Sequence, residues 1–529
     1  MDSWDRFNER ALPPIECFYS HLTKKSIDQQ SYDRLIDMWN HFGCETLGEF
    51  HDIYLKIDVL LLTCIFQNFR ATSINQFGLD PCHYFSTPGL TWDAALKSTK
   101  NKLDLLTDID MILMIEKGIR GGISCAMKRH VIANNRNSEN YDETKPSSYI
   151  TYLDVNNLYG FALNDVLPMK NFSWVSPDLF DSTIETIRNG NLDGDTGYIL
   201  EVDLLYPSEL HDYHNDYPLA PERLSVKIEW MSKYQKDLVA KIESQGLKRT
   251  ETEKLIPNLF DKHHYVVHGR NLRFYLDKGL KLNKIHRIIS FHQSAWLSPY
   301  IQMCTSNRQK AATTFEKDFW KLMVNSLYGK SIEDKRKHTK VKVIQNGKQA
   351  LQQIRKPMFE QFFILENDLA IVKLRKFEVK LDKPIYLGFT VLELSKLHMY
   401  KLHYDCFRPK YGENLSLVYT DTDSFIYHIQ TQDIVADLKE LDYIMDFSDY
   451  PTSHILHDNS NKKKLGYLKD EMNGETIDEV IALKSKLYAI KYGTRKKLTA
   501  KGVQKAEVIK SNGLLPNESK YKPGPYSGI

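Results

Sequence analysis

The chain has 529 residues, of which 42% are hydrophobic and 26% charged, a balance typical of globular proteins rather than disordered ones. Its 71 basic and 68 acidic residues give a formal net charge of +3, which excludes a histone-like polycation but permits local basic grooves. Seven scattered cysteines include no C-x-x-C pair, so the sequence predicts neither a disulfide framework nor a zinc ribbon.

Helices and strands are predicted in mixed order along the chain, which indicates an α+β fold. The expected elements, in chain order, are a buried helix at 50–70, a helix at 108–117, a polar linker at 133–148, a short strand at 150–154, an extended loop at 206–222, a helix at 315–328, two strands joined by a tight turn within 415–429, and a poorly ordered tail at 511–529.

Neither an export signal nor a membrane span is expected. The first ten residues are charged throughout, unlike a secretory signal. The longest apolar run, residues 59–66, is far shorter than the roughly 18 residues that cross a bilayer. The sequence therefore predicts a nuclear or cytoplasmic protein that is not secreted and has no membrane partner.

An aspartate ends the predicted strand at 150–154, in the run Y-L-D-V-N-N-L-Y-G. A carboxylate where the chain leaves a sheet can hold a hard divalent cation, and Tyr159 then begins the next helix beside it. The same pattern also fits an ordinary helix cap by Asp154.

A polar stripe is expected on the helix at 315–328. At about 100° per residue, Lys317, Lys321, Asn325 and Tyr328 share one face, opposite the apolar residues of the segment. An ammonium suits a phosphate, and an aromatic ring beside an amide suits a nucleobase. A solvated amphipathic face is the alternative.

A pair of acids, Asp421 and Asp423, lies in the run L-V-Y-T-D-T-D-S-F-I-Y. Strand alternation puts both carboxylates on one face, where they repel each other unless a cation or a shared proton relieves them. An exposed turn or a weak calcium loop is the alternative, although the terminal Glu of an EF-hand is missing. Together with Asp154 the pair would make a metal-binding triad, and the lysine-bearing helix favours a nucleoside triphosphate as substrate.

The runs D-x-x-N-L-Y, K-x-x-x-N-S-x-Y-G and Y-x-D-T-D-S resemble motifs A, B and C of family B DNA polymerases, in the same order. The segment that starts at Arg120 resembles Y-x-G-G, with Ile119 in place of Tyr, and Lys486 with Tyr488 resembles K-x-Y. Tyr54 and Asp58 resemble the third exonuclease motif. The segments at 206–218 and 264–268 resemble those of the protein-primed branch of this family, and within it those of Polinton (Maverick) transposon polymerases.

The resemblance implies a role for each matching residue. Asp154, Asp421 and Asp423 would be catalytic and would hold two Mg²⁺ ions together with the carbonyl of Val155, and Mn²⁺ could substitute. The implied nucleotide-binding residues are Arg308, Lys321, Asn325, Tyr328 and Tyr159, the last as a barrier to a 2′-hydroxyl. The implied DNA-binding residues are Lys486, Tyr488, Gly121 and Gly122. The implied exonuclease remnant contains Tyr54 and Asp58.

A right-hand polymerase fold is therefore expected, with a palm sheet, helical fingers, a partial exonuclease domain and a truncated thumb. The expected parts are an exonuclease remnant (1–115), a linker with the Y-x-G-G-like segment (116–150), palm with motif A (151–204), an insert or palm region resembling the first terminal-protein region (205–300), fingers with motif B (301–330), a second insert (331–382), palm with motif C (383–483), and the K-x-Y segment with the start of a thumb (484–529).

The implied activity is template-directed DNA synthesis from dNTPs on primer–template DNA, without proofreading because no earlier exonuclease acids accompany Asp58. A terminal protein is a further implied partner. One alternative is a catalytically inactive nucleic-acid-binding relic of a mobile-element polymerase. An RNA-templated or RNA-synthesising enzyme is another, which Tyr159 disfavours, and a metal nuclease is the weakest.

Overall fold

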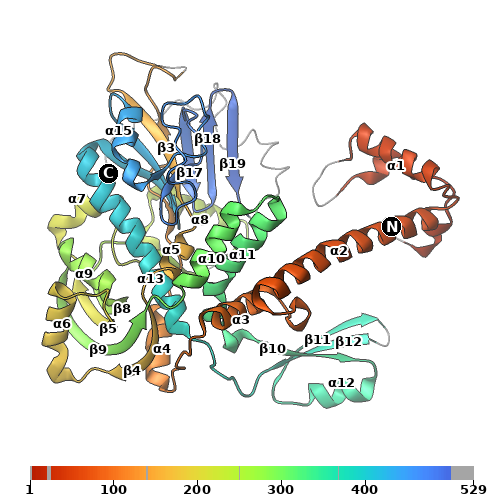
Figure 1. The fold of residues 1–529 in the computed structure, drawn as a ribbon, viewed down its shortest axis with the longest axis horizontal. Coiled ribbons are helices and arrows are strands. Elements are labelled where there is room, and N and C mark those ends of the chain that lie inside the picture. The colour runs from red at the N-terminus through yellow and green to blue at the C-terminus, as the bar shows by residue number, and fades with distance from the viewer. Residues whose placement is uncertain (1–2, 21–25, 139–140, 250, 367–368, 502–529) are drawn as a thin grey trace.

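A six-stranded sheet forms the centre of the computed structural model, which describes residues 3–20, 26–138, 141–249, 251–366 and 369–501 (Figure 1). Its strands follow the spatial order β1 (Ser124–Ala126), β13 (Leu415–Asp421), β14 (Ser424–Gln430), β3 (Ser148–Val155), β16 (Leu468–Asp470) and β15 (Met445–Asp446). All neighbours are antiparallel except β15 and β16. The strands predicted at 150–154 and within 415–429 are confirmed.

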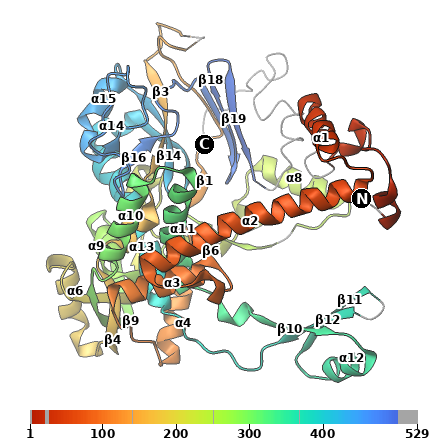
Figure 2. The same ribbon diagram turned by 45° about the vertical axis from the view of Figure 1, so that its right-hand side comes forward.

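Helix α13 (Ile385–Lys401) is buried on nearly every side. A helix that is apolar all round requires such a position, because no face of it suits water. It packs against the short helix α5 (Leu158–Leu163), helix α4 (Ile109–Gly118) and helix α11 (Thr314–Ser331). Two further helices, α14 (Arg408–Tyr411) and α15 (Ile434–Glu440), lie close to the central sheet (Figure 2).

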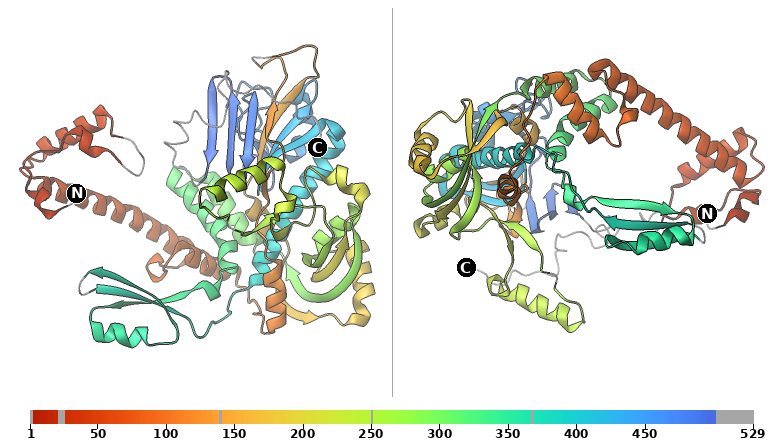
Figure 3. Two further views of the ribbon diagram at one scale, coloured as in Figure 1. Left: turned by 180° about the vertical axis from the view of Figure 1, so that it is seen from behind. Right: turned by 90° about the horizontal axis from the view of Figure 1, so that it is seen from below.

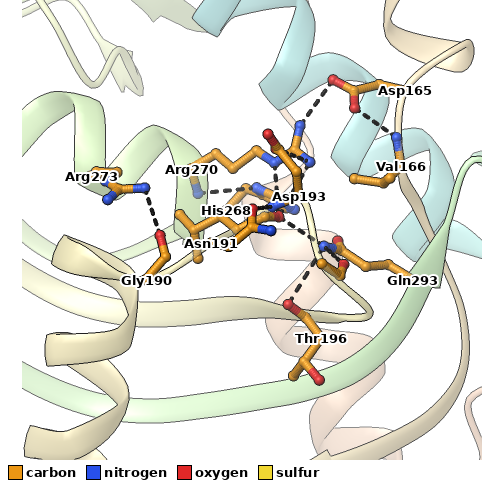
Figure 4. Close-up of polar contacts among 12 residues, drawn as sticks. Asp165, Val166, Gly190, Asn191, Asp193, Thr196, His268, Arg270, Arg273 and Gln293 are labelled. Carbon is orange, nitrogen blue, oxygen red and sulfur yellow. Dashed lines mark hydrogen bonds and ion pairs between the residues drawn. The ribbon is translucent and has the colours of Figure 1, made fainter.

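A second sheet follows in the chain and has the order β4 (Leu167–Trp174), β9 (Lys281–Ser294), β5 (Thr196–Leu205) and β8 (Lys262–His268), with helices α6 (Phe180–Asn189) and α9 (Gly269–Asp277) packed on each other. Figure 4 shows how α9 and β9 hold the loop before β5. Arg270 bonds the Leu192 carbonyl and the Asp165 carboxylate, and Gln293 bonds the carbonyls of Leu192 and Gly194. The second sheet is thereby tied to the end of α5.

Three helices pack on one another: α3 (Thr87–Thr99), α10 (Ser298–Lys310) and α11. Helix α11 begins with a capping box, in which Thr313 Oγ1 accepts from the Glu316 N–H and the Glu316 carboxylate accepts from the Thr313 N–H. The helix expected at 315–328 is therefore confirmed. Its buried side carries Phe319, Trp320 and Met323, whereas Leu322 is exposed.

Two small lobes stand away from this body (Figure 3). One is a three-stranded sheet with a helix, made of β10 (Thr339–Ile344), β12 (Leu369–Arg375), β11 (Phe359–Glu366) and α12 (Gly347–Ile354). The other contains β6 (Glu222–Ser225), β7 (Glu253–Ile256) and α8 (Lys233–Ser244). The segment expected as an extended loop at 206–222 instead contains the short helix α7 (His211–His214), and its Tyr217 is buried.

The last described segment forms a four-stranded sheet of β2 (His130–Ile132), β17 (Glu479–Lys484), β18 (Leu487–Tyr492) and β19 (Arg495–Ala500). Strand β2 brings the segment after α4 into this sheet, so residues near 130 lie beside residues near 480. The tail expected at 511–529 lies outside the described residues.

Helix α2 (Leu47–Phe77) projects from the body as a long rod and carries α1 (Gln29–His41) near its far end (Figures 1 and 2). The helix expected at 50–70 is confirmed, but its expected burial is wrong. Six apolar side chains of the run 59–66 are exposed, because the described N-terminal segments cover only the first turns of α2 and α3 contacts only its end: Val59, Leu60, Leu61, Leu62, Ile65 and Phe66.

Among the described residues, α2 is the one helix whose length and composition would allow it to cross a membrane. Core helices of soluble proteins pass the same test, so the finding is weak evidence. It does show that the eight-residue apolar run understated the hydrophobic length of this helix.

The second sheet contains strands from both sides of the domain boundary expected near residue 204. Strands β4 and β5 come from before this boundary, and β8 and β9 come from after it. The lobe of β10, β11, β12 and α12 lies within the expected second insert at 331–382. The division of the chain into named polymerase subdomains stays a prediction.

Three charged side chains are buried together where the segment after α4 meets α13. Glu393 and Lys396 lie on α13 with Oε1 and Nζ 3.2 Å apart, and Arg120 Nη1 lies 4.0 Å from the same carboxylate. Lys396 Nζ also donates to the Arg120 carbonyl at 3.0 Å, and Arg120 donates to the Val266 carbonyl at 2.9 Å. The network fixes residues 120–122 against α13 and the second sheet.

Glu393→Gln should lower the free energy of unfolding by about 3–5 kcal/mol, because it leaves two buried cations without a carboxylate. Urea denaturation at pH 7 measures the change. The surface variant Glu413→Gln, whose carboxylate is exposed beside Arg408, should change stability by less than about 0.5 kcal/mol. Equal effects of the two variants would contradict a structural role for the buried network.

Candidate active site

The three predicted acids meet at one end of three adjacent strands. Asp154 lies near the end of β3 and pairs in register with Ser424, the first residue of β14. Asp421 ends β13, and Asp423 lies in the tight turn that joins β13 to β14. The Val155 N–H donates to the Asp423 carbonyl at 2.7 Å, so motifs A and C are bonded directly. Residues about 270 positions apart are thereby brought together.

The turn between the two acids depends on the glycine pair. Thr422 has a φ of 67°, an unusual value for a β-branched residue, and its N–H donates to the Ile123 carbonyl at 2.7 Å. A Cβ on Gly122 would lie 2.4 Å from Thr422 Cγ2, so only glycine permits this approach. Gly122 thus supports the turn, while Gly121 is exposed. A DNA-binding role for either glycine stays a prediction.

Burial and mutual repulsion disturb the acids. Desolvation, followed by the negative charges of Asp423 and Glu471, raises the pKa of Asp154 to about 8. Desolvation and the charges of Asp421 and Glu471 raise the pKa of Asp423 to about 6. Glu471 directly follows β16, the strand paired with β3 on its other edge. It was missed in the sequence because no motif marks it, and only the strand order places it here.

Lys486 forms an ion pair with Asp421, the third of the acids. Its Nζ lies 2.9 Å from both carboxylate oxygens of Asp421, and its N–H donates to the Tyr419 hydroxyl at 2.9 Å. Tyr488, expected to contact DNA, is buried instead, with its hydroxyl 3.1 Å from that of Tyr152 and its ring against Tyr419. The K-x-Y segment is therefore anchored in the core by its tyrosine and reaches the acids through its lysine.

Hard oxygen ligands of this kind suit Mg²⁺, which is bound through one or two carboxylates together with substrate phosphates. The described residues hold no group of three or more His, Cys, Asp or Glu side chains in metal-binding geometry. The raised pKa values of Asp154 and Asp423 nevertheless reflect desolvation and repulsion between carboxylates, which a bound divalent cation would relieve. The donor chemistry therefore fits Mg²⁺, with Asp421 neutralised by Lys486 in the absence of the ion.

Helix α5 starts on Asn157, which has a φ of 46° and accepts a hydrogen bond from the Gly160 N–H. A Cβ on Gly160 would lie 2.4 Å from Asn157 Nδ2, so the glycine leaves room for this cap. The helix then presents Tyr159, whose ring stacks on Tyr328 of α11 with 4.1 Å between centroids. Motifs A and B thus meet through two aromatic rings.

A cavity of about 110 Å³ lies beside this contact. Its lining includes Asn156 and Asn157, directly after the strand that carries Asp154, together with Arg308 of α10 and Lys321 of α11. Asn325, one turn beyond Lys321, has a buried Oδ1 without a hydrogen-bond partner among the described residues. Arg308 and Lys321 therefore share one cavity, whereas Tyr159 and Tyr328 stack on each other outside its lining. A nucleotide-binding role for these residues stays a prediction.

Tyr54 and Asp58 lie on the projecting helix α2, and both are exposed. The described part of the chain places no further acid with Asp58 in a metal-binding group. The exonuclease assignment stays a prediction.

Several cations of the segment 484–510 already have partners. Arg495 pairs with Glu475, and Lys497 lies 3.5 Å from Glu471 and over the Tyr152 ring. Lys505 and Lys510 lie outside the described residues. Arg495 and Lys497 therefore already have acidic partners within the chain.

The raised pKa of Asp154 makes the metal-free protein sensitive to pH. An unfolded aspartate titrates near 4, so the native state binds an extra proton between about pH 4 and 8. The stability that this proton supplies is complete below about pH 4 and is lost as the pH rises through 8.

Asp154→Asn should therefore raise the free energy of unfolding at pH 9 by about 2 kcal/mol in EDTA, and by much less at pH 5. Urea denaturation at both pH values measures this. Asp421→Asn is the matched control and should give no gain, because Lys486 would lose its carboxylate. A gain for Asp154→Asn that is the same at pH 5 and pH 9 would contradict the account.

Among solved structures, the chain is similar to Phi29 DNA polymerase complexed with primer-template DNA, with 15% identity and a TM-score of 0.49 over 83% of this chain and 63% of that one. The ternary complex of Phi29 DNA polymerase with primer-template DNA and incoming nucleotide gives 14% identity and a TM-score of 0.47, over 81% and 62% of the two chains. The chain thus spans less than two-thirds of that polymerase. No curated protein matches the sequence.

A family model described as DNA polymerase type B, organellar and viral, matches residues 24–406, well over half of the chain. The match includes Asp154 and the lysine-bearing helix α11 and ends before the strands that carry Asp421 and Asp423. The sequence motifs and the grouping of their residues agree with this match. The chain therefore belongs to the organellar and viral type B DNA polymerases.

Proposed function

We propose that the chain is a template-directed DNA polymerase that adds dNTPs to a primer 3′-hydroxyl or to a protein-borne hydroxyl. The observation that carries the proposal is the cluster of Asp154, Asp421 and Asp423 next to a cavity lined by Lys321 and Arg308. An acid cluster beside a cation-lined cavity is what phosphoryl transfer needs, since catalysis there is mainly positioning and charge stabilisation.

Asp154, Asp421, Asp423 and the Val155 carbonyl would hold two Mg²⁺ ions, or Mn²⁺ in their place. Such a pair of ions activates the attacking hydroxyl and stabilises the leaving oxygen. For this to occur Lys486 must release the Asp421 carboxylate, which its flexible side chain allows. The released ammonium would then be free to bind the primer strand.

Lys321 and Arg308 would neutralise the triphosphate, and Tyr159 would lie under the sugar, held by its stacking on Tyr328. Asn325 would contact the nascent base pair through its unpartnered Oδ1. Primer–template DNA and dNTPs are the proposed partners, with a terminal protein in addition if the likeness to the Polinton (Maverick) polymerases extends to priming. Proofreading is not proposed, because Asp58 stands without partner acids among the described residues.

The Asp421→Asn/Asp423→Asn double variant should lose primer extension by about three orders of magnitude or more, because two of the three carboxylates become neutral amides. Extension of a primed single-stranded template with Mg²⁺ and dNTPs measures this. A matched control is Asp458→Asn, a surface carboxylate that bonds only Ser460 among the described residues and should leave extension unchanged.

Extension that survives in the double variant would contradict the assignment of these acids. A wild-type chain that binds duplex DNA in low salt but never extends a primer would instead support the inactive relic.

Tyr159→Val should raise the use of ribonucleotides relative to deoxynucleotides by about tenfold or more, because it removes the ring expected to exclude a 2′-hydroxyl. Steady-state incorporation of dNTPs and rNTPs measures the ratio. Tyr159→Phe keeps the ring and its stacking on Tyr328, and should keep the discrimination. An unchanged ratio in Tyr159→Val would rule out the steric role.

A further inference from the structure

The cavity beside the acids is bounded by cations from two directions. Lys321 and Arg308 come from α11 and α10, while Lys463 comes from the loop between β15 and β16. Lys463 lies in the run K-K-K at 462–464, outside the polymerase-like motifs of the sequence.

Two acids act on these cations through space, Asp318 on Arg308 and Asp449 on Lys463, but neither forms an ion pair with them. Among the described residues, neither Arg308, Lys317, Lys321 nor Lys463 forms an ion pair. Arg308 Nε is buried without a hydrogen-bond partner. Desolvation and the positive charges of Arg308 and Lys317 lower the pKa of Lys463, so the groups repel one another in the absence of an anion.

The acids that also line the cavity are already engaged. The Asp446 carboxylate accepts from Asn156 Nδ2 at 2.7 Å and from the Lys463 N–H at 2.7 Å. The Asp449 carboxylate lies 2.6 Å from Lys469 Nζ. Asp449 is thus shared between Lys469 and Lys463. The lining holds four cations (Arg308, Lys321, Lys463 and Lys469) against two acids, so the cavity keeps an excess of positive charge.

The loop that carries Lys463 is hydrogen-bonded both to α10 and to the segment after β3. Lys463 has a φ of 55°, stabilised by the bond from its N–H to Asp446. Gln309 of α10 donates to the Lys462 carbonyl at 3.3 Å. The Gly466 N–H donates to the Asn156 carbonyl at 3.0 Å, which ties the loop to motif A. The backbone that carries Lys463 is thus fixed beside the cavity.

We propose that Lys463 is a phosphate-binding residue that completes, with Lys321 and Arg308, the site for the polyphosphate tail of the incoming nucleotide. Cations that outnumber the acids around a cavity favour an anion of several charges, and a polyphosphate has that chemistry. The site also suits the pyrophosphate that leaves the reaction. The inference rests on the proposed function for its substrate, but the anion site itself can be tested without catalysis.

The chain offers a matched control in the neighbouring residue. Lys464 Nζ bonds the Tyr467 hydroxyl at 2.6 Å and lies over the Tyr467 ring, and Lys464 does not line the cavity. Lys463→Ala and Lys464→Ala therefore remove the same charge from adjacent positions, one inside the site and one outside it.

The direct test is calorimetric titration of the whole chain with inorganic tripolyphosphate in Mg²⁺ buffer. Lys463→Ala should weaken binding by about tenfold, the effect of losing one charge-assisted contact. Lys463→Arg should restore most of the affinity, and Lys464→Ala should stay within about twofold of the wild type. Lys463→Gln serves as a second variant if Lys463→Ala melts at a lower temperature than the wild type.

Wild-type protein that does not bind tripolyphosphate, or equal losses at positions 463 and 464, would overturn the inference. In primer extension, Lys463→Ala should raise the KM for dNTPs by a similar factor with little change in kcat at saturation. If the chain binds tripolyphosphate through Lys463 yet never extends a primer, this inference stands and the proposed function fails. If the chain extends primers and Lys463→Ala changes neither affinity nor KM, the inference fails alone.

Discussion

Repulsion among three carboxylates at the end of one sheet is the constraint on which the rest of this structure depends. Asp154, Asp421 and Asp423 are brought together by strand register, and burial raises the pKa of two of them. Such an arrangement costs stability unless a cation is bound. It persists because the surrounding core, built on α13 and two sheets, over-determines the backbone that carries the acids.

The supporting contacts come from segments far apart in the chain. Gly122 packs under Thr422, and the buried network of Arg120, Glu393 and Lys396 fixes the glycine segment from behind. Lys486 approaches from the opposite side and neutralises Asp421. The glycine and K-x-Y segments therefore act first on the geometry and charge of the acids. Any contact that they make with DNA would come in addition to this role.

The strands, the acids and helix α11 could be predicted because each has a strong local pattern: alternation, a carboxylate at a strand end and a capping box. Glu471 and Lys463 could not be predicted in this way. Glu471 is brought to the site by the order of the strands, and Lys463 by a loop in which it has a left-handed backbone conformation. Neither feature leaves a local pattern in the sequence. The burial of Tyr488 and the exposure of α2 could not be predicted from the sequence either. Hydrophobicity alone does not say which element covers a given face.

The most direct test of the central claim is divalent-ion binding by the three acids, measured by titration of the metal-free chain with Mn²⁺. The account predicts that the wild type binds Mn²⁺ and that Asp154→Asn weakens this binding by about tenfold or more, since the cluster loses its most perturbed carboxylate. It also predicts that Lys486→Ala strengthens binding, because the competing ammonium is gone. Mn²⁺ binding that neither variant changes would show that the three carboxylates do not form a metal site.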